Sequence, residues 1–583
     1  MNLNEEVKNK IHKAHFVSGV EPKDYQISFK NIYEILLQRV SEQPEEVFIK
    51  FYSDDGDRIE LTYKEFAEKV FRTANFLRSK GIDVEDRVAT VSQNHINTVI
   101  QYFAAWCLGA TVVPINVNEE TDRIKYILES SKTKLAFVHG NYFEKISSLG
   151  LNDIQLVKHG KQLANTDESY FEKLIESEST HFKPDENVYQ ETEALIVYTS
   201  GTTGLPKGVV LTQYNLMVDA DGISKWHKIT KGQTMMCVLP IHHVNGTIVT
   251  IMTPMYAGGK LILNQKFHTN KFFERLAKEN VQIVSVVPTL LQFLCNDYDT
   301  PLLEGEGQGV RSVNKIKHLP NFRHIICGAG PLTCELAMKF ENMFGLKIVH
   351  GYGLSETTCY SCFCPADLNE KEHKTWLNDF GFPSIGIAIE PNEMDIQNEN
   401  GESLKEGERG EIVIRGHNVM KYYDGNIEAN EKTFEFGWFR SGDEGFYKTD
   451  SPGRKYFFIT GRLKELIIRG GINISPLEID EVLMSLPEIK SAIAVGFDND
   501  WYGEEVGALV VLEEGRWQKA EGKKMAEELK EKILKQCKEK LPFHKTPKVI
   551  VFSDSIPVTS TGKYQRNKVK HLFEEWKRVQ FKK

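Results

Sequence analysis

The alternation of two hydrophobic periodicities constrains the fold of this chain more than any other feature of its sequence. From about Ile32 onwards, helical stretches with apolar residues every three or four positions, such as Phe66, Val70, Ala74 and Leu77, alternate with short apolar runs. The runs that we interpret as buried strands are Arg87–Val91, Thr111–Val113, Ala194–Tyr198, Gln282–Val287, His324–Cys327 and Lys347–His350. Because helices separate these strands, the sequence predicts a doubly wound α/β body with mostly parallel sheets.

The pattern changes towards the C-terminus. After Gly410 the strand-like segments become shorter, as in Glu411–Arg415 and Tyr456–Thr460, and a final compact unit mixes both element types. In that unit we expect helices at Pro476–Ser485 and Ala520–Lys540 and strands at Ser491–Val495, Gly507–Leu512 and Lys548–Phe552. Two glycine-rich or charged stretches, Thr300–Lys315 and Asn369–Asn378, are predicted to be inserted loops.

These changes divide the chain into three expected parts, with the main boundary near Gly461–Lys464. Residues 1–28 are polar and are expected to form an extension on the surface. Residues 29–463 would form a large domain of doubly wound sheets, with a β-rich part at about 382–463. Residues 464–583 would form a small, mobile α+β domain.

The composition excludes several classes of protein. The 583 residues are 41% hydrophobic and 26% charged, as in an ordinary globular chain, and the net charge of −9 argues against nucleic-acid binding. Nine cysteines are too few for a disulfide-stapled scaffold, and the polar N-terminus carries no signal-peptide pattern. The apolar run Tyr102–Val117 is interrupted by Gly109 and Pro114, which predicts no membrane span. A cytoplasmic protein is expected.

A loop rich in glycine and hydroxyl groups follows the apolar strand Ala194–Val197. The segment Tyr198–Gly208 contains three glycines, four Ser or Thr residues and Lys207. Glycine permits close backbone approach, while amides, hydroxyls and the lysine supply hydrogen bonds and charge for an oxyanion. The spacing fits neither the P-loop pattern G-x-x-x-x-G-K-[ST] nor the dinucleotide pattern G-x-G-x-x-G. Taken alone, the segment could equally be a Gly/Thr-rich turn.

The loop resembles the signature phosphate loop of the adenylate-forming superfamily, which includes acyl-CoA synthetases, nonribosomal-peptide adenylation domains and luciferases. Six further motifs match this family in the same order, between about Leu61 and Arg566: Pro240–Gly246, Gly328–Leu332, Gly351–Thr357, Ser441–Asp443, Gly461–Glu465 and Pro557–Lys563. The resemblance implies that a carboxylate attacks the α-phosphorus of ATP and that pyrophosphate leaves, so that an acyl-AMP forms. Since both reactants are anions, the site must neutralise charge and align them.

The resemblance also implies a nucleotide site, residue by residue. The implied phosphate cradle is Thr199, Ser200, Gly201, Thr202, Thr203, Gly204 and Lys207. Glu356 would hold Mg²⁺, which prefers oxygen ligands, and Thr357 would donate to the α-phosphate. The implied contacts to adenine and ribose are Gly328, Ala329, Gly330, Gly351, Tyr352, Gly353, Asp443 and Arg462. Lys563 would reach back from the small domain to the carboxylate and phosphate. Outside this context, Glu356 reads as a helix-start carboxylate, Tyr352 as a core residue and Lys563 as a surface lysine.

The acyl pocket is the next element that the resemblance implies. His243 matches the family histidine at the pocket floor and joins the catalytic candidates Lys207, Thr357 and Lys563, although a structural role remains open for it and for His242. The expected pocket wall contains Val244, Asn245, Val287 and Cys359. This wall is mostly apolar, which favours an aliphatic or aryl acid over an amino acid. Cys359, Cys362 and Cys364 hint at a metal site, but structural thiols are favoured because no second Cys/His pair lies nearby in sequence.

Transfer to CoA would follow a swing of the small domain. Lys464 occupies the position of the family's hinge residue, and the swing would present Arg469, Gly470 and Gly471 to a pantetheine channel. Coumarate–CoA ligases and luciferases tend to carry lysine where this chain has Gly470. That departure argues against luciferase-type oxidation and leaves the contacts to the CoA phosphates open.

The leading hypothesis is therefore an AMP-forming acid–CoA ligase that uses ATP, Mg²⁺ and CoA on a fatty or other apolar acyl or aryl acid. An alternative is an adenylation protein that loads a carrier protein, and the sequence has no carrier-like segment of its own. A third is a catalytically silent binding protein, against which the joint presence of Lys207, Glu356, Asp443, Arg462 and Lys563 argues. A homodimer is left open.

Overall fold

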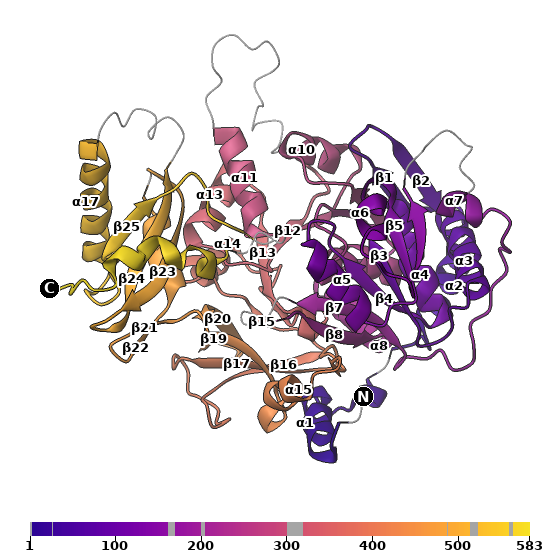
Figure 1. Ribbon diagram of the computed structural model, residues 1–583, viewed down its shortest axis with the longest axis horizontal. Coiled ribbons are helices and arrows are strands. Elements are labelled where there is room, and N and C mark those ends of the chain that lie inside the picture. Colours follow the sequence, from indigo (N-terminus) through magenta and orange to yellow (C-terminus); the bar gives the residue numbers. More distant parts are fainter. Residues whose placement is uncertain are drawn as a thin grey trace, which may run out of the picture.

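The computed structural model describes residues 3–25, 27–160, 169–199, 205–299, 319–486, 488–512, 523–558 and 564–582. In these ranges the chain forms two large sheets flanked by helices, an antiparallel β subdomain and a small C-terminal α+β domain (Figure 1). The fold class predicted from the sequence is thereby confirmed.

The first large sheet has seven strands in the order β18-β8-β7-β4-β3-β5-β6. The strands of its parallel centre are β3 (Arg87–Val91), β4 (Thr111–Ile115), β5 (Leu135–His139), β6 (Gln155–His159) and β7 (Glu193–Thr199). Two antiparallel strands, β8 (Lys207–Thr212) and β18 (Tyr422–Tyr423), extend one edge. The predicted phosphate loop therefore lies between two neighbouring strands, β7 and β8.

The second large sheet has nine strands in the order β15-β14-β13-β12-β11-β9-β10-β1-β2 and is parallel from β13 to β1. Its strands are β1 (Val47–Tyr52), β2 (Arg58–Thr62), β9 (Thr234–Cys237), β10 (Lys260–Asn264), β11 (Ile283–Val286), β12 (His324–Cys327), β13 (Ile348–Tyr352), β14 (Cys362–Phe363) and β15 (Ile387–Ala388). Helix crossovers make this pattern possible, because parallel neighbours cannot be joined by a tight turn.

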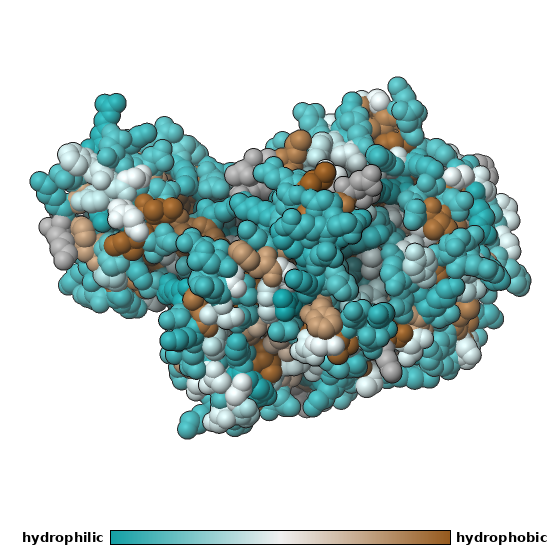
Figure 2. Space-filling view, turned by 90° about the horizontal axis from the view of Figure 1, so that it is seen from below, coloured by the Kyte–Doolittle hydropathy of each residue, from teal (hydrophilic) through white to brown (hydrophobic). Residues whose placement is uncertain are grey.

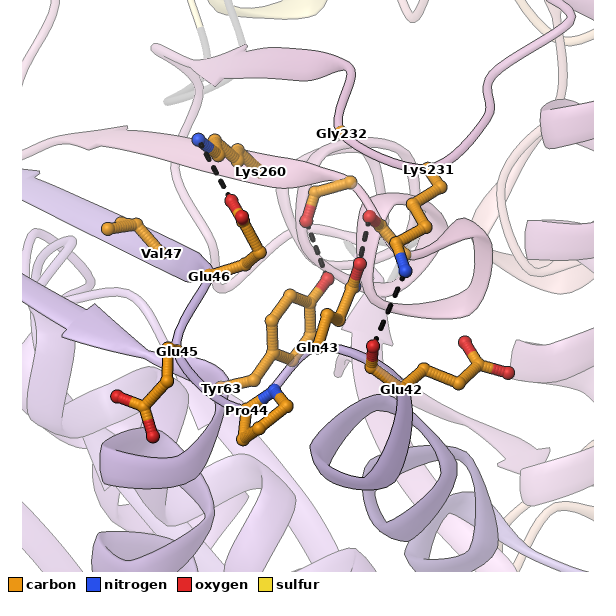
Figure 3. A pocket seen from close by; sticks show the side chains of 12 residues that line it. Glu42, Gln43, Pro44, Glu45, Glu46, Val47, Tyr63, Lys231, Gly232 and Lys260 are labelled. Carbon is orange, nitrogen blue, oxygen red and sulfur yellow. Dashed lines mark hydrogen bonds and ion pairs between the residues drawn. The ribbon is translucent and has the colours of Figure 1, made fainter.

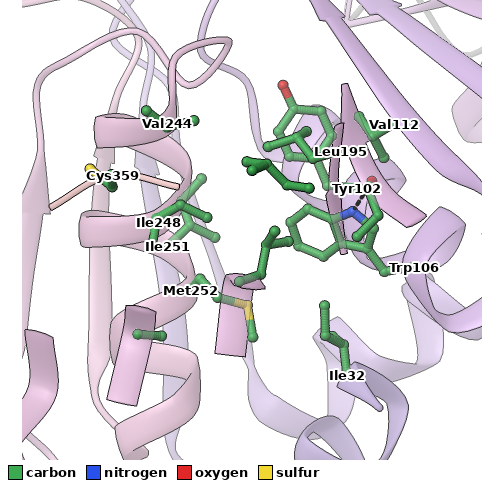
Figure 4. Close-up of a cluster of buried hydrophobic side chains, with 14 of the residues drawn as sticks. Ile32, Tyr102, Trp106, Val112, Leu195, Val244, Ile248, Ile251, Met252 and Cys359 are labelled. Carbon is green, nitrogen blue, oxygen red and sulfur yellow. Dashed lines mark hydrogen bonds between the residues drawn. The ribbon is translucent and has the colours of Figure 1, made fainter. Parts of the chain in front are cut away.

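The helices of this body are amphipathic or fully buried. They are α2 (Ile32–Glu42), α3 (Tyr63–Ser79), α4 (Ile96–Leu108), α5 (Thr121–Ser130), α6 (Phe143–Ser147), α7 (Phe171–Leu174), α8 (Gln213–Trp226), the π-helix η3 (Asn245–Met252), α9 (Thr253–Ala257), α10 (Thr269–Lys278), α11 (Pro288–Asp299) and α13 (Cys334–Phe344). Thr62 and Glu65 form a capping box at the start of α3, which fixes where that helix begins. Figure 4 shows how α4 and η3 share a core, with Tyr102 and Trp106 facing Ile251 and Met252.

The β subdomain and the C-terminal domain complete the structure. The subdomain is an antiparallel sheet of β16 (Asn392–Gln397), β17 (Gly410–Gly416), β19 (Phe439–Thr449) and β20 (Lys455–Arg462), with α15 (Ile427–Thr433) nearby. The C-terminal domain contains β21 (Ile467–Arg469), β22 (Ile472–Ile474), α16 (Pro476–Met484), β23 (Ile489–Asn499), β24 (Gly503–Leu512), α17 (Lys523–Lys540), β25 (Val549–Phe552) and the 3₁₀ segment η6 (Arg566–Trp576). In Figure 2 it forms the lobe on the left, separated from the larger body by an indentation in the outline.

One expectation about the loops is wrong. Asn369–Asn378 was predicted to be an inserted loop, but residues 370–378 form the helix α14 (Glu370–Asn378). Asn369 caps this helix in a capping box with Glu372, and the ring of Trp376 stacks on Tyr456 at 3.7 Å between centroids. The cap and this aromatic anchor stabilise a helix whose sequence is otherwise mostly charged. The other predicted insertion, Thr300–Lys315, lies outside the described residues.

The N-terminal extension is anchored to the β subdomain. Helix α1 (Glu5–His15) begins at the N-cap Asn4 and buries Val7, Ile11 and Ala14. Figure 1 shows α1 beside α15 at the edge of the subdomain. Within the described ranges, every helix is either too short or too polar to cross a lipid bilayer.

Candidate active site

The phosphate loop begins and ends on paired residues. Thr199, at the end of β7, is in register with Lys207, at the start of β8, so both lie at the open end of this strand pair. Ser200, Gly201, Thr202, Thr203 and Gly204 lie outside the described residues. The Nζ of Lys207 lies 4.9 Å from the ring centroid of Tyr423. Burial and the charge of Lys464 lower the pKa of Lys207, whereas Glu356 acts to raise it.

Glu356 and Thr357 lie on a single 3₁₀ turn, η4 (Ser355–Thr357), after β13. The hydroxyl of Tyr423 donates to Oε1 of Glu356 at 2.7 Å, so this carboxylate is oriented by a strand from the other large sheet. The hydroxyl of Thr357 accepts from the amide of Leu354 at 3.0 Å, donates to the carbonyl of Leu354 at 3.3 Å and is buried within its own turn. To donate to the α-phosphate, this hydroxyl would have to give up its bond to Leu354.

The turn continues into a strained residue. Thr358 has φ 60° and ψ −56°, and the amide of Cys359 donates to the carbonyl of Thr357 at 2.6 Å, which closes a γ-turn. A positive φ is costly for a β-branched residue and persists only where the surroundings impose it. Here the hydroxyl of Thr358 donates to the carbonyl of Asn418 at 2.6 Å. The segment around Asn418 therefore helps to hold the strained turn that carries Glu356.

The predicted ribose site contains an ion pair and a tyrosine hydroxyl bonded to it. Asp443 on β19 and Arg462 on β20 are cross-strand partners, and Nε of Arg462 lies 2.9 Å from Oδ1 of Asp443. The hydroxyl of Tyr352 donates to Oδ2 of the same carboxylate at 2.6 Å. Burial and Asp443 raise the pKa of Tyr352, and Asp443 raises the pKa of Arg462. Tyr352, predicted to stack on adenine, is thus tied through its hydroxyl to the residue predicted to bind ribose.

Two predicted adenine-side turns pack directly against each other. A Cβ atom on Gly328 would lie 2.6 Å from the carbonyl oxygen of Gly351 and 2.5 Å from the hydroxyl of Tyr360. A Cβ atom on Gly353 would lie 1.9 Å from the carbonyl oxygen of Cys359. These two positions exclude any side chain, so both glycines are explained by packing. Ala329, between Gly328 and Gly330, has a φ of 60°.

The expected acyl pocket combines apolar walls with a polar network. Val244 and Val287 are buried, and Figure 4 shows Val244 and Cys359 at one end of an apolar cluster. Asn245, predicted as a wall residue, donates from Nδ2 to the hydroxyl of Tyr360 at 3.1 Å and accepts from Ser285 at 2.7 Å.

The two neighbouring histidines lie together near this pocket. The rings of His242 and His243 are 4.3 Å apart between centroids. Burial lowers the pKa of His242 well below its usual value, and its Nε2 is buried with no hydrogen-bond partner among the described residues. His242 is therefore neutral in this environment.

Sequence reasoning missed a buried carboxyl group beside this region. Asp219 on α8 is fully buried, and Nδ2 of Asn418 donates to its Oδ1 at 2.8 Å. Burial raises the pKa of Asp219 to about 8. Tyr423 and Asn418 were missed as well, because their partners lie far away in sequence and no local motif marks them.

The residues predicted for CoA transfer lie in the C-terminal domain or at its border. Lys464 is exposed in the turn between β20 and β21. Gly470 and Gly471 form the β21–β22 turn with φ of 57° and 83°. Arg469 is buried, with Nε 2.6 Å from Glu505 and its guanidinium 3.9 Å from the ring centroid of Tyr502. Lys563 lies outside the described residues.

The cysteines after Glu356 bond to the backbone. The thiols of Cys362 and Cys364 donate to the carbonyls of Ile385 and Ser384, each at 3.2 Å. Among the described residues, no group of three or more His, Cys, Asp or Glu side chains is arranged to hold a metal ion. All nine cysteines lie within the described ranges, are buried and form no disulfide.

A separate pocket of about 410 Å³ lies between the end of α2 and the starts of β1 and β10 (Figure 3). Its polar groups pair within the protein: Gln43 donates to the carbonyl of Gly258, and Tyr63 donates to that of Gly259. Lys231 lies 3.5 Å from the carbonyl of Glu42. None of the residues predicted to bind nucleotide or acid lines this pocket.

Comparisons with known proteins agree with the motifs. Residues 36–424 match the AMP-binding enzymes, and residues 478–563 match the AMP-binding enzyme C-terminal domain. An oxalate–CoA ligase of Arabidopsis thaliana is 31% identical and covers 89% of this chain and 94% of its own length. A long-chain-fatty-acid–CoA ligase of Mycobacterium tuberculosis is 28% identical, over 92% of this chain and 97% of its own.

The fold agrees with a solved structure. The crystal structure of ATP-bound MatB from Rhodopseudomonas palustris gives a TM-score of 0.78 at 23% identity, covering 94% of this chain and 99% of that one. The family match spans most of the sequence, and the predicted motifs fall within the two matched ranges, except Ser441–Asp443 and Gly461–Glu465, which lie between them. The chain therefore belongs to the AMP-binding enzyme family and is an AMP-forming acid–CoA ligase.

Proposed function

We propose that this chain activates a compact carboxylic acid with an apolar aliphatic or aryl tail as its acyl-AMP and passes the acyl group to CoA. The relatives act on acids as different as oxalate and long-chain fatty acids, so similarity alone does not select the substrate. The observation that carries the proposal is that Val244, Val287 and Cys359, which we expect to line the acyl pocket, are apolar and buried. Ile248 and Ile251, in the same cluster as Val244 and Cys359, are fully buried (Figure 4). A long chain would have to displace packed side chains, which is costly.

The nucleotide would bind between two oriented carboxylates. Glu356, held by Tyr423, would ligate Mg²⁺ together with the phosphates, and its acidic oxygens suit that ion. The ion would neutralise charge on the pyrophosphate as it leaves. Lys207 would add positive charge on the same side, and Asp443, paired with Arg462, would accept from the ribose hydroxyls.

The same residues explain why two anions can react. The carboxylate of the acid and the α-phosphate repel each other in water, and fixed cations in a site that excludes water offset this repulsion. Lys563 would supply the cation nearest to the reacting carboxylate. Lys207 and Glu356 would hold the leaving group in line with the attacking oxygen.

Transfer to CoA would use a second arrangement of the small domain. We place the division between the domains at 463/464 and assign the hinge to Lys464, which is exposed and lies between two sheets. The charges of Lys464 and Lys207 repel each other in the present arrangement, which favours departure of Lys464 once pyrophosphate has left. The Arg469–Gly471 turn would then approach the thiol.

The experiment is a product and substrate screen with purified protein. Butyrate, benzoate, palmitate and oxalate would be offered with ATP and Mg²⁺, and pyrophosphate and AMP would be measured with CoA and with an acyl carrier protein. We expect pyrophosphate and AMP, the highest kcat/KM for butyrate or benzoate, and turnover with CoA. ADP and phosphate as products would refute the reaction, and preference for palmitate or oxalate would refute the compact apolar acid.

A further inference from the structure

The N-terminal segment reaches the loop behind Glu356. Nε2 of His15, the last residue of α1, lies 3.1 Å from the carbonyl oxygens of both Val419 and Met420. Because both neighbours are acceptors, Nε2 must carry the proton and donate to them. Burial lowers the pKa of His15 to about 4, so the ring is neutral at ordinary pH.

The loop that His15 holds contacts Glu356 on its other side. The amide of Met420 donates to the carbonyl of Glu356 at 2.7 Å. Three residues further on, the hydroxyl of Tyr423 donates to the Glu356 carboxylate. Met420 therefore links the imidazole of His15 directly to the main chain of Glu356, and the backbone from Met420 to Tyr423 links it to the side chain.

The rest of the N-terminal segment is fixed to the same neighbourhood. The carbonyl of Val20 lies 3.2 Å from Nε2 of His417, and the hydroxyl of Tyr25 donates to Asp221 on α8 at 3.0 Å. The apolar face of α1 is buried against the β subdomain, next to its strand β17. The match to the AMP-binding enzymes begins at residue 36, so His15, Val20 and Tyr25 lie outside it.

We propose that His15 is a positioning residue for adenylation, which fixes Val419 and Met420 and thereby the Glu356 carboxylate. This inference rests on the proposed role of Glu356 at the metal-bound phosphates. It predicts that loss of the imidazole weakens the use of MgATP and leaves the binding of the acid unchanged. The N-terminal segment would thus help to position a residue of the active site.

The test compares four single variants by pyrophosphate release. His15→Ala removes the donor, and His15→Gln restores an N–H donor on a side chain of similar reach. His12→Ala is the matched control, because His12 lies on the same helix with its side chain 57% exposed. Val7→Ala removes packing from α1 without touching the hydrogen bonds. For each variant, kcat and KM for MgATP and for the acid are measured with Tm.

One lost hydrogen bond of this kind predicts a kcat/KM for MgATP about threefold to tenfold lower in His15→Ala. The KM for the acid should not change, His15→Gln should recover most of the loss, and His12→Ala should match the wild type. An unaltered His15→Ala refutes the proposal. So does a His15→Ala loss that Val7→Ala reproduces at equal Tm, because helix packing alone would then explain it.

A second readout does not depend on activity. Hydrogen exchange at the amide of Met420 should become faster in His15→Ala and stay at the wild-type rate in His12→Ala, since opening of the loop frees that amide. Unchanged exchange in His15→Ala refutes the proposal even if catalysis falls. A wild-type protein without pyrophosphate release would instead refute the proposed function, while the exchange result would still decide whether His15 holds the loop.

Discussion

The two sides of the candidate nucleotide site each hold a carboxylate through a tyrosine hydroxyl, yet their electrostatics differ. On the ribose side, Tyr352 donates to Asp443 and Arg462 pairs with its other oxygen. On the phosphate side, Tyr423 donates to Glu356, and the two cations Lys207 and Lys464 repel each other. The ribose side is therefore neutralised within the protein, whereas the phosphate side gains most from a bound anion. The ribose side is therefore formed before ATP binds, whereas the phosphate side is completed only by bound ATP.

The largest effect is expected on the phosphate side. Glu356→Ala removes the proposed metal ligand, and loss of such a charged group in a site that excludes water costs about 10²–10³ in rate. Single-turnover acyl-AMP formation at limiting Mg²⁺ measures it. Glu356→Gln keeps an acceptor for Tyr423 but loses the charge, and it should fall as far. A folded Glu356→Ala variant with a wild-type rate would show that the phosphate side does not need this carboxylate.

The hinge proposed at Lys464 leads to a second prediction. Lys464→Pro fixes φ at the proposed hinge and should hinder the swing, so acyl transfer from supplied acyl-AMP to CoA should fall by more than about tenfold. Acyl-AMP formation should stay within about twofold. Lys464→Arg, which keeps both the positive charge and a flexible backbone, serves as the control and should spare both steps. Equal damage to both half-reactions in Lys464→Pro would remove the hinge from the account.

The two tyrosines allow the two sides to be compared with the same chemical change. Tyr423→Phe and Tyr352→Phe each delete one hydroxyl that donates to a carboxylate, a bond worth about 1.5–3 kcal/mol, or roughly tenfold or more. We expect Tyr423→Phe to raise the Mg²⁺ concentration needed for half-maximal rate. Tyr352→Phe should raise the KM for ATP at saturating Mg²⁺ instead. If both variants change the same parameter, the proposed division of the site into two sides is wrong.

The last prediction concerns stability, not rate, beside the acyl pocket. Burial raises the pKa of Asp219 to about 8 in the folded protein, whereas the unfolded chain has the ordinary value near 3.8. The folded state therefore binds the proton more tightly, and its stability falls as pH rises from about 4 to 8. Asp219→Asn removes this dependence. The difference in Tm between Asp219→Asn and the wild type should shift in favour of the variant between pH 5 and pH 8, and a constant difference would contradict the raised pKa.

Features that depend on residues close together in sequence could be predicted, whereas those that depend on distant residues could not. The strands Arg87–Val91 and His324–Cys327 were predicted with the bounds that the structure has, because apolar runs between helices are a local signal. Helix α14 was missed because its residues are mostly charged, although Asn369 and Glu372 form a readable capping box.

Long-range contacts were beyond the sequence alone. Tyr423 lies 67 positions from Glu356, and His15 lies 404 positions from Val419. The motifs identified which carboxylates to examine, but the hydroxyl and imidazole that hold them follow from the packing of three sheets. The same holds for Asp219, whose buried carboxyl group meets Asn418 only in the folded chain.

The measurement that tests the central claim most directly follows one oxygen atom. If the acid attacks the α-phosphorus of ATP and CoA then displaces AMP, an acid labelled with heavy oxygen in its carboxylate must leave one labelled oxygen in AMP. Mass spectrometry of AMP after complete turnover with labelled benzoate or butyrate should find that atom there, and unlabelled pyrophosphate. Label in pyrophosphate or phosphate, or unlabelled AMP alongside the thioester, would contradict adenylation at this site.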